Sequence, residues 1–273
     1  MPFKGKALCL IVVLHALVLP VVAQAALGII VARTADLKVV RKAMEGEGVV
    51  VRNGREFYSG RIGAVPVVII RSPRGKIQNA ITTQMLLQHF PMDRVISLGT
   101  AGALDNALEP GDILIAQSAL EHDTGTMKPY GLIWEGRDNE GSRTKDSSAA
   151  QRKFTTLARE AALRLSERNG GFHVVEGPLV SGDQFIASEP KKEWLVKRFG
   201  AKAVDMTGAA VAQACEAHGV PFLLIRLITD RAGDQAGDEY VDSLRRFEGR
   251  LGQIVTEFVR QMSSSPVTPE ATP

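Results

Sequence analysis

Short apolar runs and longer amphipathic segments alternate along most of the chain. The apolar runs are rich in β-branched residues and bounded by polar or turn residues, which is typical of buried strands. They are LGIIVA (27–32), VPVVII (65–70), RVISLGT (94–100) and PFLLIRLIT (221–229), with a looser alternation in GDILIAQSAL (111–120). The pattern predicts that these segments form the core of a sheet.

Helical patterns separate these runs. They cover residues 35–45, 79–90, 147–169, 207–218 and 243–262. Strands that alternate with helices indicate an α/β sheet covered on both faces. We expect a single domain over residues 26–262, with a long polar surface loop at Thr124–Thr144 and a tail at 263–273 that is disordered by composition.

The N-terminus has the composition of a secretory signal peptide. Lys4 and Lys6 precede an apolar run, Ala7–Val22, and the small-residue site Ala23-Gln24-Ala25 follows. This order predicts cleavage after Ala25 and a secreted or periplasmic protein with no membrane attachment afterwards. The alternative is a retained membrane anchor, but the run is shorter than the roughly 20 residues that span a bilayer.

Charge and cysteine content exclude several function classes. The net charge is +3, of which Lys4 and Lys6 supply two, so the body lacks the basic surface of a nucleic-acid-binding protein. Cys215 would remain alone after cleavage, and its helical context indicates a buried structural residue. The histidines and cysteines lack metal-ligand spacing. The sequence therefore indicates no metal, no cofactor and no nucleic-acid partner.

Polar residues follow several of the predicted strands, where α/β sheets bind their ligands. These candidates are Asp36, the turn Gly99-Thr100-Ala101-Gly102, the stretch Asp205-Met206-Thr207, and the pair Thr229-Asp230. Each has a structural alternative, since a GTAG turn can be only a turn and an aspartate can serve only as a helix cap. No P-loop, GxSxG or dinucleotide fingerprint accompanies them.

Taken together, the motifs resemble the nucleoside phosphorylase/nucleosidase superfamily. Their order is GII (28–30), GKIQNA (75–80), LGTAGAL (98–104), GDI (111–113), SGDQFI (181–186), VDMTGAA (204–210) and PFLLIRLITD (221–230). The nearest likeness is to the methylthioadenosine/S-adenosylhomocysteine nucleosidases, and it covers about Gly28 to Leu244. The resemblance implies one α/β domain with a twisted, barrel-like mixed β-sheet flanked by helices, and a homodimer or higher homo-oligomer.

The resemblance also implies a site for a purine nucleoside. Asp230 would be the general acid that protonates N7 of the leaving base, with Thr229 orienting its carboxyl group. Phe185 would stack on the base, although a buried core position is its alternative, and the backbone of Ile186 would contact the purine edge. Met206 would lie under the ribose. Thr100 and Gly102 would line the site.

The nucleophile distinguishes hydrolysis from phosphorolysis. Phosphorylases of this superfamily carry an arginine where this chain has Ser97, so a bidentate phosphate anchor is missing at that position. The nucleosidases hold a water molecule with a glutamate and an arginine, and Asp36 and Arg226 match those two positions. We therefore expect a hydrolase, with phosphate binding through Arg33 or Arg231 as the alternative.

The sugar end departs from the nucleosidase pattern. Glu-Met-Glu becomes Asp205-Met206-Thr207 here, so a hydroxyl replaces the carboxylate that binds the ribose hydroxyls. Asp36 is also one methylene shorter than the expected glutamate. These changes leave open a non-catalytic nucleoside-binding protein. At the 5′ end, the resemblance implies a loop of a neighbouring subunit, here with Met127, Tyr130 and Trp134, and a solvated loop is the alternative.

Overall fold

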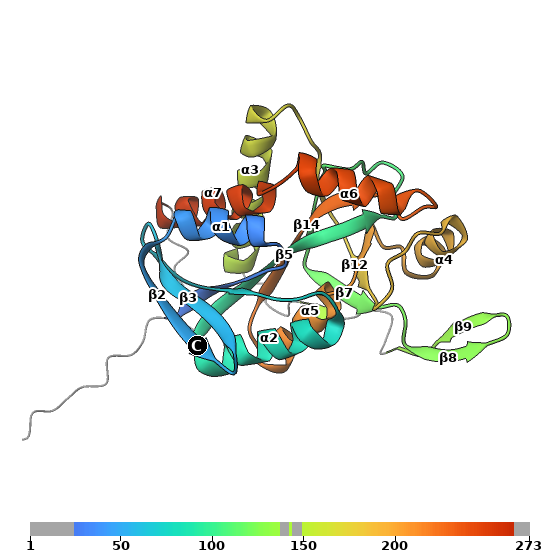
Figure 1. Cartoon of the computed structure of the whole chain (residues 1–273), viewed down its shortest axis with the longest axis horizontal. Helices are drawn as coiled ribbons and strands as arrows, with labels where there is room; N and C mark the ends of the chain where they lie inside the picture. Colours follow the sequence, from blue (N-terminus) through green and yellow to red (C-terminus); the bar gives the residue numbers. More distant parts are fainter. Residues whose placement is uncertain (1–24, 137–141, 144–148, 265–273) are drawn as a thin grey trace, which may run out of the picture.

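The computed structural model describes residues 25–136, 142–143 and 149–264, and within them a mixed β-sheet is flanked by helices (Figure 1). The strands are β1 Ala26–Val31, β2 Glu45–Arg52, β3 Arg55–Ile62, β4 Val65–Arg71, β5 Met92–Ala103, β6 Ile113–Ala116, β7 Ser118–Glu121, β8 Gly125–Lys128, β9 Gly131–Trp134, β10 Ser142–Arg143, β11 Val174–Glu176, β12 Leu179–Ser181, β13 Ala203–Asp205 and β14 Phe222–Asp230. The helices are α1 Thr34–Lys42, α2 Lys76–His89, α3 Ala149–Arg168, α4 Glu189–Phe199, α5 Gly208–Ala217, α6 Ala236–Arg246 and α7 Arg250–Ser264. This is the predicted α/β class, with one mixed sheet covered on both faces.

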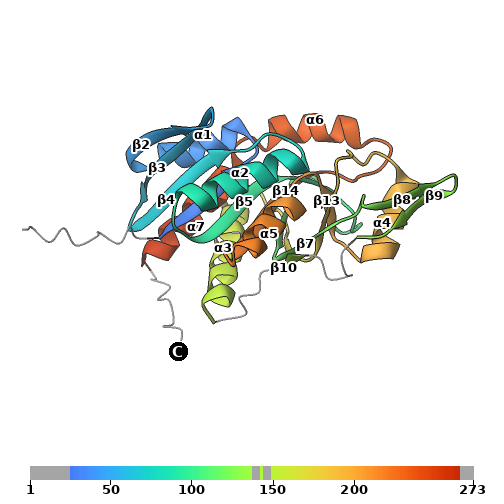
Figure 2. The ribbon, with the colours of Figure 1, turned by 90° about the horizontal axis from the view of Figure 1, so that it is seen from below.

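The alternation of side chains along the strands produces two cores. In β1, Leu27 and Ile29 belong to a buried cluster that also contains residues of α1, α3 and α7. Ile30, which points the opposite way, belongs to a second cluster with residues of α2 and α5. Figure 1 shows α1, α6 and α7 above the sheet and α2 and α5 below it, and in Figure 2, seen from below, α2 and α5 lie in front. Strands buried on both faces explain why their sequences are continuous apolar runs.

The long central strand β5 positions the site. It pairs in parallel with β1 on one side and with β14 on the other, and its last residues pair with β13. Gly99 is the partner of Arg226, and Gly102 is the partner of Asp230 after an irregularity in β14. The carboxyl ends of β1, β5 and β14 therefore converge on one edge of the sheet, where such sheets bind ligands.

Two predictions about secondary structure are wrong. The predicted helix at 243–262 is two helices, α6 and α7, because Gly249 adopts φ +74° and breaks the helical path between them. Helix α7 also continues to Ser264, beyond the predicted start of the tail at residue 263. The segment predicted as a loop at 124–144 contains the β8–β9 hairpin, in which Lys128 pairs with Gly131.

The β2–β3 hairpin was not predicted, although the sequence carries its signal. Arg52 pairs with Arg55 across a two-residue turn. Both turn residues, Asn53 and Gly54, have positive φ angles of 47° and 73°. An Asn-Gly pair between strands is the preferred sequence for this type of turn. Strand β2 is mostly exposed and contains glycines, so its sequence lacks the apolar run that marks the buried strands.

The predicted signal peptide and tail fall largely outside the described residues, which begin at Ala25 and end at Ser264. Strand β1 begins at Ala26, directly after the predicted cleavage position. Among the described helices, none has both the length and the apolar composition that a membrane span requires.

Candidate active site

A cavity of about 260 Å³ opens at the carboxyl ends of β1, β5, β13 and β14. Nine of the residues predicted for the site line it: Thr100, Gly102, Phe185, Ile186, Asp205, Met206, Thr207, Thr229 and Asp230. The fold thus brings together side chains from four distant stretches of sequence. Two predicted residues, Asp36 and Arg226, are not among the residues that line the cavity.

Asp230 is a buried carboxyl group at the end of β14. Its side chain accepts hydrogen bonds from the Thr229 hydroxyl at 2.9 Å and from the Ala232 backbone N–H at 3.0 Å. Burial raises the pKa of Asp230 above its ordinary value, and the two hydrogen bonds only partly oppose this effect. A carboxyl group held in this way keeps its proton to higher pH, which suits a general acid.

Gly102 leaves room for this carboxyl group. A Cβ atom at Gly102 would lie 2.6 Å from Oδ1 of Asp230 and 3.1 Å from the Cβ atom of Ala232. Any other residue would push the acid out of place. The glycine of the GTAG stretch is therefore required by a close approach inside the site.

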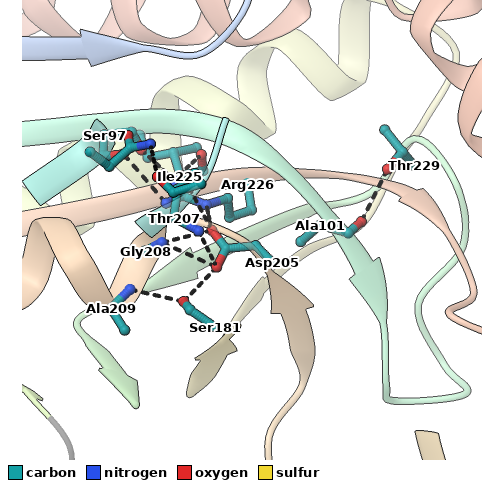
Figure 3. Close-up of polar contacts among 12 residues, drawn as sticks. Ser97, Ala101, Ser181, Asp205, Thr207, Gly208, Ala209, Ile225, Arg226 and Thr229 are labelled. Carbon is teal, nitrogen blue, oxygen red and sulfur yellow. Dashed lines mark hydrogen bonds and ion pairs between the residues drawn. The ribbon is translucent and has the colours of Figure 1, made fainter. Parts of the chain in front are cut away.

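Asp205 is the centre of a buried polar cluster (Figure 3). Its Oδ2 atom accepts from Arg226 Nε at 2.8 Å and from the Thr207 hydroxyl at 3.0 Å. Its Oδ1 atom accepts from the Ser181 hydroxyl at 2.5 Å, and the Gly208 backbone N–H contacts both oxygens. The carboxylate thus fixes the start of α5 and retains little capacity to bind a ligand directly.

Arg226 lies beneath the cavity, which corrects the prediction that it holds a water molecule there. Its side chain is fully buried, and besides Asp205 it donates to the Ser97 carbonyl oxygen at 2.7 Å and contacts the Ser97 hydroxyl at 3.3 Å. Gly99 of β5, which lines the cavity, lies against Arg226, since a Cβ atom there would be 3.4 Å from Arg226 Nε. Arg226 therefore supports the floor of the site.

Asp36 also lies away from the cavity, contrary to its predicted role. It sits in the first turn of α1, is 1% exposed, and accepts a hydrogen bond from the Gly252 backbone N–H at 3.0 Å. Helix α7 packs closely against α1 here, because a Cβ atom at Gly252 would lie 2.7 Å from the Asp36 carbonyl oxygen. The shorter side chain joins two helices instead of reaching the site.

Thr207 and Phe185 form parts of the cavity wall. The Thr207 hydroxyl donates its proton to Asp205, so toward a ligand it can only accept a hydrogen bond. Phe185 is 41% exposed and meets Tyr240 edge to face at 5.5 Å between ring centroids. An exposed ring on a cavity is available for stacking on a planar ligand, and this placement excludes the alternative of a buried core position.

The chain is similar to known proteins over most of its length. Residues 26–260 match the phosphorylase superfamily. The chain belongs to this superfamily. A 5′-methylthioadenosine/S-adenosylhomocysteine nucleosidase of Geobacillus kaustophilus is 31% identical over 86% of this chain and 96% of its own length.

Solved structures of superfamily members share the fold. The nucleosidase of the same type from Neisseria meningitidis, solved with methylthio-immucillin-A, has a TM-score of 0.74 and 28% identity, covering 86% of this chain and 99% of its own. The futalosine hydrolase of Helicobacter pylori has a TM-score of 0.69 and 27% identity, covering 88% and 97%. Both matches extend over nearly the whole described domain.

The cavity of this superfamily member also contains Arg74, Gln184 and Tyr240, which sequence reasoning did not place there, and Arg33, which it named only as an alternative phosphate-binding residue. Arg33 follows β1, and Arg74 directly precedes the Gly75-Lys76 stretch that was part of the motif pattern. Their positions after strands β1 and β4 were a usable signal, because most other site residues also lie near or just after the carboxyl end of a strand. Tyr240 lies within α6 and had no such signal.

The β8–β9 hairpin stands apart from the cavity in this chain. Trp134 packs against Phe199 and donates its indole N–H to the Glu121 carbonyl oxygen at 2.8 Å. Met127 and Tyr130 are 69% and 80% exposed. None of these three lines the cavity. In the described part of the chain, no group of histidine, cysteine, aspartate and glutamate side chains could hold a metal ion.

Proposed function

We propose that the protein hydrolyses the N-glycosidic bond of a purine nucleoside, as methylthioadenosine-type nucleosidases do, in purine salvage. Its kinship with those enzymes makes it an N-glycosyl hydrolase. The observation that carries the proposal is the buried Asp230 carboxyl group, with its raised pKa, in a cavity that also contains the exposed ring of Phe185. A carboxyl group that can protonate the base, together with an aromatic ring that can stack on it, suits a reaction in which a purine is the leaving group.

The chemistry rests on activation of the leaving base. The bond between C1′ and the base nitrogen breaks, its electron pair passes to the base, and Asp230 gives its proton to N7. The sugar then has oxocarbenium character. The oxygen of a water molecule bonds to C1′, and this water releases one proton to solvent, from which Asp230 recovers its own. The products are the free base and the free sugar.

Water is favoured over phosphate as the nucleophile. Ser97 stands at the position of the phosphorylase arginine, and both its carbonyl and its hydroxyl group are engaged by Arg226. Neither of the residues expected to hold the water, Asp36 and Arg226, lines the cavity. The side chains of Thr100 and Thr207 also line the cavity, and their hydroxyl groups take over this role in the proposal.

The test is release of free base from adenosine, 2′-deoxyadenosine, inosine and methylthioadenosine, with and without phosphate. Asp230→Asn is the probe, and Asp242→Asn, an exposed aspartate of α6, is the matched control. We expect phosphate-independent release that collapses only in the probe variant. Release that requires phosphate would identify a phosphorylase instead.

A non-catalytic nucleoside-binding protein is the second candidate, and the displacement of Asp36 and Arg226 from the cavity favours it. Binding of adenine or nucleosides without any release of base would support this candidate. Calorimetric titration of the same panel separates the two functions.

We also propose that the mature protein begins at Ala26 and acts outside the cytoplasm. The basic residues, apolar run and Ala23-Gln24-Ala25 site support this location. N-terminal sequencing of protein from fractionated cells tests it. A retained Met1 in the cytoplasmic fraction would contradict it.

A homodimer or higher homo-oligomer is proposed as the working form. Support comes from apolar side chains left exposed on two surfaces: Ile77 and Ile81 on α2, and Met127 and Tyr130 on the β8–β9 hairpin. Sedimentation of the wild type and of Ile77→Ser tests the proposal. Monomers at all concentrations in the wild type would refute it.

A further inference from the structure

Two arginine side chains line the same cavity as the proposed general acid. Arg33 follows β1 and Arg74 follows β4, and both belong to the cavity wall. The Ala32 backbone N–H donates to the Leu98 carbonyl oxygen, and the Ser72 backbone N–H donates to the Val31 carbonyl oxygen. The two segments are thereby held side by side, next to β5.

Both guanidinium groups donate hydrogen bonds to residues of α6. Arg33 Nη2 donates to the Leu244 carbonyl oxygen at 2.7 Å, and Arg74 Nη2 donates to the Tyr240 hydroxyl at 3.2 Å. Tyr240 and Leu244 are four residues apart, so they lie on adjacent turns about 6 Å apart. Both arginines are therefore anchored to α6 at the wall of the cavity.

Neither arginine forms an ion pair within the described residues. No carboxylate lies within ion-pair distance of Arg33 or Arg74 in this part of the chain. The Arg33 Nη1 atom is buried without a hydrogen-bond partner. Asp36, the neighbouring carboxyl group, interacts electrostatically with Arg33 but accepts its hydrogen bond from the Gly252 N–H. A buried donor such as Arg33 Nη1 is costly unless a partner is present, and the exposed Arg74 lines the same cavity, which together point to an anionic ligand.

Arg33 and Asp230 are attached to the sheet at different positions along β5. The strand β5 residue beside Ala32 is Leu98, whereas Asp230 pairs with Gly102, four residues further along. A nucleoside whose base contacts Asp230 would then direct its sugar substituent toward the arginines. A neutral or alkylthio substituent would leave both charges unpaired.

We infer that the substrate is a purine nucleoside with an anionic group, a phosphate or a carboxylate, on C5′, bound by Arg33 and Arg74. This inference rests on the proposed nucleoside-cleaving function and specifies its substrate class. The planar guanidinium groups offer paired N–H donors that match the oxygens of either anion.

The experiment compares kcat/KM for adenosine 5′-monophosphate, adenosine 5′-carboxylate, adenosine and methylthioadenosine. The variants are Arg33→Met and Arg74→Met, which keep an unbranched apolar stem, and Arg245→Met, an exposed arginine of α6 outside the cavity, is the control. We expect the wild type to favour the anionic substrates by at least about tenfold, as charge-assisted hydrogen bonds allow. The ratio of kcat/KM for the anionic substrates to kcat/KM for the neutral ones should fall toward one in both probe variants. It should stay at the wild-type value in the control.

Two results would overturn the inference. One is a preference for anionic over neutral substrates that is as large in both probe variants as in the wild type. The other is acceleration of adenosine cleavage by free phosphate that depends on Arg33 or Arg74, since the arginines would then bind the nucleophile.

Calorimetric binding of adenosine 5′-monophosphate and adenosine to Asp230→Asn separates this inference from the proposed function. Arginine-dependent preference for the monophosphate, without turnover of any substrate by the wild type, would support the anion site and reject the hydrolase. Turnover without any preference would retain the hydrolase and reject the anion site.

Discussion

Asp205 and Arg226 form an ion pair of 2.8 Å between Oδ2 and Nε, with side chains that are 1% and 0% exposed. The carboxylate comes from the end of β13 and the guanidinium group from the middle of β14. Through Gly208 and Ser97 the pair connects the start of α5 to β5. It is therefore the internal support of the cavity floor, under residues that contact the ligand.

Loss of one partner of this pair should destabilise the fold strongly. Arg226→Met leaves the Asp205 carboxylate buried without its counter-ion, and such losses cost about 3–5 kcal/mol. Urea unfolding measures the change. Arg164→Met, which removes exposed ion pairs with Glu160 and Glu257, is the control and should cost less than about 1 kcal/mol. Equal losses of unfolding free energy in the two variants would show that the buried pair stabilises the fold no more than exposed pairs do.

Asp230→Asn should lower kcat by about 10²–10⁴-fold, the usual contribution of a general acid. The amide keeps the shape of the side chain but cannot deliver a proton to the base. Steady-state release of adenine measures the effect, and Asp242→Asn should match the wild type. If Asp230→Asn retained most of its turnover, proton donation by this residue would be ruled out.

The stability of the protein should decrease with rising pH because of Asp230. Burial raises its pKa in the folded state above the ordinary 3.8, so the folded state binds the proton more tightly than the unfolded state does. The resulting stabilisation is complete below about pH 3.8 and is lost as the pH rises through the folded pKa.

Thermal unfolding from pH 4 to pH 8 tests this dependence. The Tm of Asp230→Asn should gain on that of the wild type as the pH rises, because the amide has no charge to bury. Asp36, whose pKa is also raised by burial, is present in both proteins and cancels in the comparison. If the two Tm curves stay parallel as the pH rises, ionisation of Asp230 does not destabilise the folded protein.

Thr207 should determine how strongly ribose is preferred over 2′-deoxyribose. Its hydroxyl donates to Asp205 and can accept from a sugar hydroxyl, a bond worth about 0.5–1.5 kcal/mol. Thr207→Val should therefore reduce the kcat/KM ratio of adenosine to 2′-deoxyadenosine by about two- to tenfold. Thr207→Ser should preserve it. An unchanged ratio in Thr207→Val would place the sugar hydroxyls on other residues.

The apolar runs and their motifs were sufficient to predict the class of fold and most of the cavity. Strands such as LGIIVA and PFLLIRLIT are buried on both faces, and burial on both faces requires the continuous apolar residues that their sequences contain. The strand-end positions of Thr100, Asp205 and Asp230 follow from the chain order of an α/β sheet. In contrast, the β8–β9 hairpin and the break at Gly249 depended on turn conformations that a polar, glycine-containing stretch does not specify.

The sequence by itself determined which segments are buried and which side chains end each strand, because these features depend on residue order and hydrophobicity. Only the tertiary structure decided which side chains reach the cavity. Asp36 bonds to Gly252, more than two hundred residues away, and Arg226 turns to Asp205 and Ser97. Arg33 and Arg74, separate in sequence, both bond to α6 and line the same cavity. Such contacts depend on long-range packing and on competition among partners, which strand order does not specify.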